Sequence, residues 1–71
     1  MTELIPHLKT WRIDANLTQQ ELAERIGVSR KTINTVENGI FVPSTVLALK
    51  LAKALGATVE QLFELRQADR P

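Results

Sequence analysis

Cysteine is absent from the 71-residue chain, and histidine occurs once, at His7. These two scarcities exclude disulfides, thiol nucleophiles and metal sites built from cysteines or several histidines. No run of about 18 apolar residues occurs, so no transmembrane helix is expected. The first residues lack the basic segment and apolar core of a signal peptide. We therefore expect a cytoplasmic protein with no metal, no cofactor and no membrane partner.

The chain also lacks an excess of either positive or negative charge. Nine Lys and Arg residues against eight Asp and Glu leave a formal net charge of +1, whereas a strongly basic composition would by itself indicate nucleic-acid binding. Any such inference must therefore come from the positions of the charges. The length fits one domain, residues 1–71, and a core this small depends on well-capped helices or on a partner subunit.

Caps and chain-breaking residues predict five helices and an all-α fold. The first is expected from about Pro6 to Ala15, because proline suits the first turn of a helix. Thr18 and Glu21 form a T-x-x-E capping box at the start of the second, and Ser29 is a good N-cap for the third. The third is expected to end at Asn38-Gly39, a pair that also suits a β-hairpin but here follows a helical pattern.

The last two helices follow after a short loop. The fourth is expected from about Ser44 to Gly56 and is apolar over much of its girth, as central helices are. At the start of the fifth, Thr58 and Gln61 repeat the capping box, and this helix is expected to include Leu65. The chain is expected to fray from Gln67 onward.

The second and third helices are joined by a short turn around Gly27. Glycine can adopt the positive φ that such a turn requires, and the small side chain of Ala23 allows the two helices to cross closely. This is the pattern of a helix-turn-helix over about residues 18–38. An ordinary helical hairpin in a small bundle has the same pattern, so both interpretations stay open at this point.

The outward face of the third helix favours the helix-turn-helix. Arg30 and Lys31 stand in the first turn, where cations oppose the helix dipole. A polyanionic partner would offset that cost, and the N-terminal end of a recognition helix is the end that reaches bases; the alternative is two solvated charges. Once apolar Ile33 and Val36 are set aside, the candidate base-reading residues, whose polar groups suit base edges, are Arg30, Lys31, Thr32, Asn34 and Thr35.

The stretch LTQQELAERIGVSRKTINTVENG at 17–39, followed by PSTVLALKLAKALGATVEQLFEL at 43–65, resembles the phage-repressor/Cro-type (XRE) helix-turn-helix family. The resemblance covers most of the chain. It implies a compact five-helix lambda-repressor-like fold and sequence-specific binding of double-stranded DNA, usually by a transcriptional repressor.

The same resemblance implies roles for single residues. The family's variable base-reading positions match Arg30, Lys31, Asn34 and Thr35, and its phosphate contacts match Gln19 and Asn38, to which we add Ser29. A buried salt bridge of the family matches Arg12 and Glu37. The helix dipole disfavours a carboxylate near a helix C-terminus, and a salt bridge to Arg12 would offset this cost for Glu37. The alternative is that both residues are exposed charges that contribute little to stability.

One recognition helix reads few base pairs, so we expect a homodimer on a palindromic operator with half-sites one helical turn apart. The chain departs from the family after E-N-G, where Ile40 replaces a Lys or Arg. Ile40 is expected to be a lone exposed apolar residue or part of a protein contact, whereas Phe41 and Trp11 are expected in the core. Candidates for the dimer interface, unless they close the monomer's own core, are Leu62, Phe63, Leu65 and Ile40.

Two other functions are compatible with the sequence. An antitoxin that binds a partner toxin and autoregulates its operon is the alternative from a different class, and a controller of a restriction–modification operon is a further kind of regulator. An enzyme is not expected, because the chain has no cysteine, one histidine, no phosphate-binding glycine loop and no close pair of carboxylates in a plausible cleft. The bound protein is expected on the bacterial nucleoid.

Overall fold

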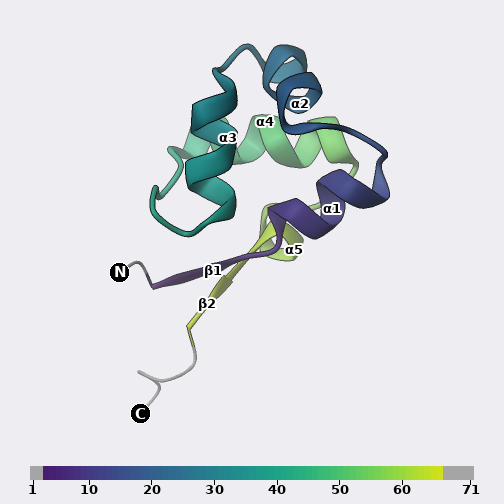
Figure 1. Cartoon of the computed structure of the whole chain (residues 1–71). Helices are drawn as coiled ribbons and strands as arrows, with labels where there is room; N and C mark the ends of the chain where they lie inside the picture. The colour runs from purple at the N-terminus through teal and green to yellow at the C-terminus, as the bar shows by residue number, and fades with distance from the viewer. Residues whose placement is uncertain (1–2, 67–71) are drawn as a thin grey trace.

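The computed structural model describes residues 3–66. In this range the helices pack into a single bundle, and two short strands extend from it side by side (Figure 1). The expected fraying from Gln67 concerns residues outside the described range. The elements in chain order are β1 (Leu4–Pro6), α1 (Leu8–Asp14), α2 (Gln19–Ile26), α3 (Arg30–Glu37), α4 (Thr45–Leu55), α5 (Val59–Leu62) and β2 (Phe63–Leu65).

Side-chain caps set the starts of four helices, as the sequence predicts. Thr18 Oγ1 accepts the backbone N–H of Glu21 at 3.0 Å, and the Glu21 carboxylate accepts the N–H of Thr18 at 2.8 Å. Thr58 begins α5 through the same reciprocal pair of bonds, and Ser29 and Ser44 cap α3 and α4. These bonds satisfy backbone N–H groups that have no partner inside the helix, so the starts of these helices follow from local sequence.

Residues with positive φ follow α1, α2, α3 and α4, and the one after α3 is Gly39 (φ 72°). Gly27 (φ 76°) and Gly56 (φ 65°) terminate α2 and α4 in the left-handed conformation. Asn16, after α1, has a φ of 60° and is the one non-glycine residue with positive φ in the described chain. A Cβ atom at Gly27 would meet nothing within 4 Å. The requirement for glycine in the turn is therefore conformational and does not come from lack of space.

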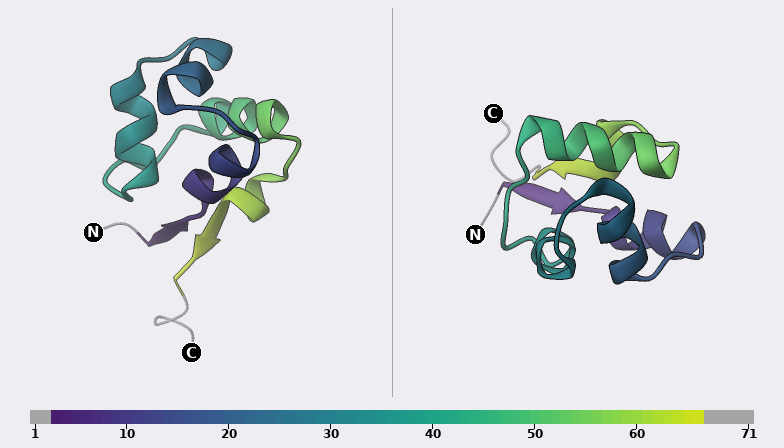
Figure 2. Two further views of the ribbon diagram at one scale, coloured as in Figure 1. Left: turned by 45° about the vertical axis from the view of Figure 1, so that its right-hand side comes forward. Right: turned by 90° about the horizontal axis from the view of Figure 1, so that it is seen from above.

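The core lies where α2 packs against both α3 and α4. Ala23 is completely buried, as expected for a position at which two helices cross closely. Figure 2 shows α4 on the opposite side of the domain from α3. The largest fully buried side chains come from all five helices, and they are Leu8, Leu22, Ile33, Val36, Leu51 and Leu62.

The predicted start of the first helix and the predicted end of the fifth helix are wrong, because both segments are strands. Pro6 belongs to β1, and α1 begins only at Leu8; likewise Phe63–Leu65 form β2 instead of continuing α5. The strands pair antiparallel with Leu4 opposite Leu65. Proline lacks a backbone donor and is tolerated in an edge strand. Apart from this two-stranded sheet, the fold is the predicted five-helix domain.

The loop after α3 also differs from expectation. Phe41 is exposed, although it was expected in the core. The N–H groups of Ile40 and Phe41 both donate to the carbonyl oxygen of Thr35, at 3.0 and 3.3 Å, so the chain folds back along the end of α3 and leaves both side chains outside. Trp11, in contrast, is partly buried and packs against the core as expected.

Candidate nucleic-acid interface

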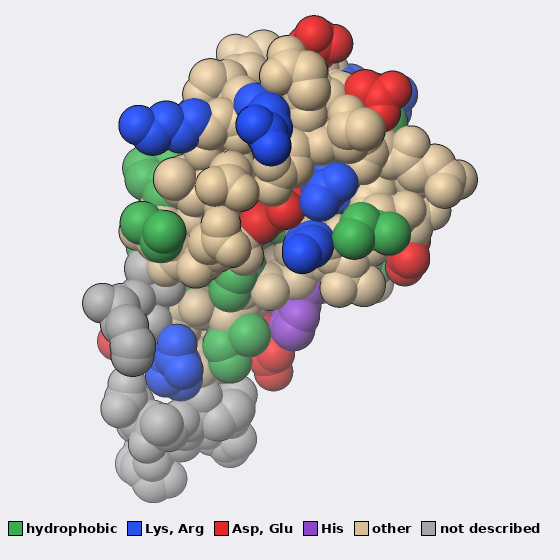
Figure 3. Space-filling model, viewed as in Figure 1, with side chains coloured by type: hydrophobic (Ala, Val, Ile, Leu, Met, Phe, Trp, Pro, Cys, Tyr) green, Lys and Arg blue, Asp and Glu red, His purple; other side chains and the backbone are tan. Residues whose placement is uncertain are grey.

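The outward side of α3 is polar and, at its start, cationic. Arg30, Lys31 and Asn34 are exposed, whereas Ile33 and Val36 face the core. Neither Arg30 nor Lys31 has an ion-pair partner within the described residues. Figure 3 shows Lys and Arg side chains over α3 and beside α1 on this side of the molecule. The geometry leaves these three side chains accessible to a large anionic ligand.

The two threonines of the predicted base-reading set are turned back toward their own helix. Thr35 Oγ1 donates to the carbonyl oxygen of Thr32 at 3.0 Å. Thr32 Oγ1 lies 3.0 Å from Ser29 Oγ, which also accepts the Thr32 N–H at 3.2 Å. Both threonines are partly buried. They are therefore less available to a ligand than the three exposed side chains of α3.

A buried ion pair fixes α3 to α1. Arg12 Nε donates to Glu37 Oε2 at 2.6 Å, and Arg12 Nη2 donates to Glu37 Oε1 at 3.3 Å, in a two-pronged contact. The exposed fractions of the two side chains are 11% and 3%. Arg12 Nη1 also donates to the carbonyl oxygen of Leu17 at 2.8 Å. One guanidinium therefore joins α1, the loop before α2, and α3.

Gln19, at the start of α2, extends this contact to the outward face. Its Nε2 donates to Glu37 Oε1 at 3.0 Å and to Asn34 Oδ1 at 3.2 Å. Asn38 Nδ2 donates to the Asn34 carbonyl oxygen at 2.9 Å and to its Oδ1 at 3.3 Å. The side-chain oxygen of Asn34 is thus held from two sides, and its Nδ2 has no hydrogen bond within the described chain. The sequence does not reveal this bridge, because it depends on how α2 crosses α3.

The first turns of α2 and α3 have opposite electrostatics. The pKa of the Glu21 carboxyl is held below its usual range by the hydrogen bonds from the Thr18 backbone and side chain, with a further contribution from Arg25. An ionised carboxylate complements the helix dipole at the start of α2. The first turn of α3 has no acidic residue and instead carries Arg30 and Lys31, so its positive field is unopposed.

The predicted dimer residues divide into two groups. Leu62 and Phe63 are buried in the chain's own core, with exposed fractions of 0% and 8%, so they offer little surface to a partner. Leu65 and Ile40 are 66% and 72% exposed. The alternative foreseen for the first pair, that they close the monomer's core, is the one the structure contains.

The described residues contain no group of three or more His, Asp or Glu side chains placed to hold a metal ion. No helix among them is both long enough and apolar enough to cross a membrane.

In this site α3 is polar and carries two cations that have no ion-pair partner in the described chain. A short glycine turn joins it to α2, and a buried ion pair fixes it to α1. These features define a helix-turn-helix DNA-binding domain. A family model described as helix-turn-helix matches residues 8–62, so the chain belongs to that family, which is of the phage-repressor/Cro type. The protein is a DNA-binding transcriptional regulator and not an enzyme.

Proteins of similar sequence are described as the same kind of regulator. The chain is 48% identical over 56 residues to an uncharacterised helix-turn-helix-type transcriptional regulator of Methanocaldococcus jannaschii, covering 79% of this chain and 85% of the relative. A similarly described regulator of Bacillus subtilis is 38% identical over 60 residues, covering 84% and 91%.

Solved structures show the same fold. The restriction–modification controller protein of Aeromonas hydrophila superposes with a TM-score of 0.73 at 38% identity, covering 79% of this chain and 85% of that one. The clp gene regulator of Corynebacterium glutamicum gives 0.71 at 35% identity, and the match covers 76% of this chain but only 57% of that longer chain.

Proposed function

We propose that the protein is a transcriptional repressor that binds a palindromic operator as a homodimer, in the cytoplasm and on the nucleoid. The observation that carries the proposal is the exposed set Arg30, Lys31 and Asn34 on a helix fixed by the buried Arg12–Glu37 pair. A reading helix must hold its side chains in one orientation, and this pair restrains α3 relative to α1.

In this proposal α3 lies in the major groove and its first turn contacts base edges. Arg30 and Lys31 donate to guanine O6 and N7, the acceptors that cations prefer. Thr32 and Thr35 have short side chains, and in this proposal they contact bases only when α3 lies deep in the groove. Gln19, Ser29 and Asn38 contact phosphates at the edge of the groove and fix the register of the domain on the duplex.

The orientation of Asn34 predicts a definite preference. Asparagine reads adenine with both amide atoms, donating to N7 and accepting from N6. Here the Oδ1 atom already accepts from Gln19 and Asn38, so Asn34 offers only its Nδ2 donor. We therefore expect the base pair facing Asn34 to be selected for a major-groove acceptor, such as thymine O4 or guanine O6, and not for adenine alone.

The dimer is proposed to form through the outer side of α4 and the strand pair, here called the α4–sheet face. It surrounds an apolar hollow of about 210 Å³ lined by Leu4, Pro43, Thr45, Ala48, Leu49, Val59 and Phe63. Leu65 shares the sheet face of Phe63, because alternate residues of a strand point the same way. Val46 lies one turn before Leu49, and both are exposed.

A second copy suits this face for two reasons. It collects several exposed apolar side chains of the described chain, and such patches mark protein contacts. It also lies on α4, opposite α3 (Figure 2), so pairing there leaves the α3 surface of each copy uncovered. The exposed loop residues Ile40, Phe41 and Val42 lead directly into Pro43 at the rim of the hollow.

Sedimentation equilibrium tests the dimer. Leu49→Lys places a charge in the face and should convert dimers to monomers. Ile13→Lys is the matched control, because Ile13 is 52% exposed against 57% for Leu49 and lies on α1. Dimers that persist in Leu49→Lys, or a wild-type protein that is monomeric with and without operator DNA, would contradict this interface.

Selection of bound fragments from random duplex DNA tests the reading of sequence. We expect an enriched palindrome with half-site centres about 34 Å apart. A single enriched half-site would contradict the dimer alone, whereas the absence of any enriched sequence would contradict specific recognition. Repression itself is tested by placing the enriched site over a reporter promoter, where expression should fall when the protein is supplied.

A further inference from the structure

A second surface of the molecule carries cations that the reading helix does not use. Between α2 and α4 lies an open cleft of about 420 Å³, lined by Arg25, Ile26, Lys50, Lys53 and Ala54. No residue of α3 lines it and no carboxylate does. The three cations have no ion-pair partner within 4 Å in the described chain, although Arg25 is near enough to Glu21 to attract it along α2.

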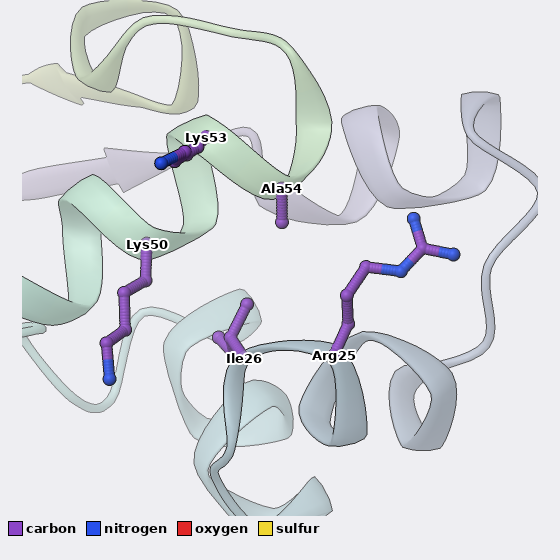
Figure 4. A pocket seen from close by; sticks show the side chains of 5 residues that line it. All are labelled: Arg25, Ile26, Lys50, Lys53 and Ala54. Atoms are coloured by element: carbon purple, nitrogen blue, oxygen red, sulfur yellow. The ribbon is translucent and has the colours of Figure 1, made fainter.

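The arrangement of the side chains indicates the shape of a ligand. Figure 4 shows Lys50 and Lys53 on one side of the cleft and Arg25 on the other, with Ile26 and Ala54 between them. The charged groups point apart and do not converge on one point. A single compact anion would reach only one of them, whereas a chain with negative groups on both sides of an apolar side chain would reach all three.

We infer that this cleft binds an acidic polypeptide segment of a partner protein, with one apolar side chain of the segment seated between Ile26 and Ala54 and its carboxylates facing Lys50, Lys53 and Arg25. Opposite charges across an interface favour encounter and fix register. A nucleic-acid backbone is the other polyanion to consider, but it would leave the apolar floor of the cleft without a partner. The inference stands independently of which DNA sequence α3 reads.

A direct binding measurement tests it. The probe is a fluorescein-labelled peptide of glutamates around a central leucine, and fluorescence polarisation is measured with the full chain at about 0.15 M salt, where the screening length is about 8 Å. The matched peptide has glutamine at every glutamate. We expect saturable binding of the acidic peptide only.

Charge reversal locates the site. Lys50→Glu/Lys53→Glu should weaken peptide binding about tenfold or more, since two attractions become repulsions. Lys9→Glu reverses an exposed cation on α1, outside the cleft, and should change binding little. Both lysines of the cleft are exposed, so the melting temperature of the double variant should stay close to that of wild type and confirm that it folds.

Two further readouts separate the cleft from the other surfaces. Binding of operator DNA and the sedimentation-derived dimer constant should both be retained in the double variant. Failure of the acidic peptide to bind, or equal binding by the double variant, would overturn the inference. A parallel loss of DNA binding would assign these cations to the DNA contact, and a loss of dimer would assign them to the α4–sheet face; either result would also overturn it.

Discussion

At the scale of single residues, Glu37 has an unusual position for a carboxylate. It lies at the C-terminal end of α3, where the helix dipole disfavours negative charge, and its side chain is only 3% exposed. Two bonds from Arg12 and one from Gln19 compensate for this position. Each of the two buried charges therefore depends on the presence of the other.

Glu37→Ala should lower the free energy of unfolding by about 3–5 kcal/mol, because it leaves the Arg12 guanidinium buried without its counter-charge. Thermal or urea unfolding measures the loss. Glu24→Ala is the matched control: Glu24 is exposed and bonds only to Gln20 in the described chain, so its removal should cost about 0.5 kcal/mol or less. A Glu37→Ala melt that matches wild type would show that the pair does not stabilise the fold.

Arg30→Ala and Lys31→Ala should each weaken operator binding by about 1–3 kcal/mol and relax the preference at one or two base pairs. The measure is the set of sequences that each variant enriches from random duplex DNA. Lys9→Ala, on α1, should leave the enriched sequence unchanged. An unchanged preference in both α3 variants would mean that these cations contact only phosphates.

Single residues were predictable where their surroundings are local or where the family motif covers them. The pairing of Arg12 with Glu37 was expected from the family motif and from the position of Glu37 near a helix C-terminus, and the structure contains it. The bridge from Gln19 to Asn34 was not expected, because two amides on different helices reveal their partner only when the helix crossing is known. The inward turn of Thr32 and Thr35 is local to α3, but it was not expected either, because the sequence pattern does not fix which way a hydroxyl group points.

At the scale of elements, helix starts were the most predictable feature. A capping residue and its partner three positions on lie within one turn, so Thr18, Ser29, Ser44 and Thr58 could be found in the sequence. The strands could not be found. Each has three residues, too few for a visible alternation, and each pairs with a segment at the other end of the chain.

The capping box of α2 should give the fold a dependence on acidic pH. The folded-state pKa of Glu21 lies below its usual range, so its stabilising effect is present above the unfolded pKa and is lost as the pH falls through the lowered folded value. Glu21→Gln keeps a capping partner but cannot titrate. We expect the melting temperatures of wild type and variant to differ at neutral pH and to converge in acid.

The α5 capping box serves as the built-in comparison for that measurement, because it already uses Gln61. Replacing Gln61 by Glu should add a pH dependence of the same sign that wild type lacks at this helix. Melting temperatures of wild type and Glu21→Gln that run parallel down to acid pH would show that the Glu21 carboxylate makes no difference to the folded state.

At the scale of the whole molecule, the charge balance limits how DNA is held. The net charge is +1, and the proposed phosphate contacts of Gln19, Ser29 and Asn38 come from neutral side chains. Only cations that neutralise phosphates release counterions and steepen the salt dependence. We therefore expect the slope of log K against log salt to be modest, about 5 or less in magnitude for a dimer.

Titration of operator binding between about 0.05 and 0.2 M salt measures that slope. Asn38→Ala should weaken binding to all sequences without changing the slope, whereas Lys31→Ala should reduce the slope if Lys31 also neutralises phosphate. A steep slope for the wild-type protein would mean that other cations, such as those of the α2–α4 cleft, reach the duplex.

The pairing of Leu4 with Leu65 joins segments near the two ends of the described chain and encloses all five helices between them. Closing so large a loop is costly in chain entropy, and contacts so distant in sequence form slowly. The helices, whose caps and turns are local, can assemble first. Backbone amides of β1 and β2 should accordingly exchange with solvent deuterium sooner than those of α2 and α4. The helix-turn-helix formed by α2 and α3 should fold before the two strands pair.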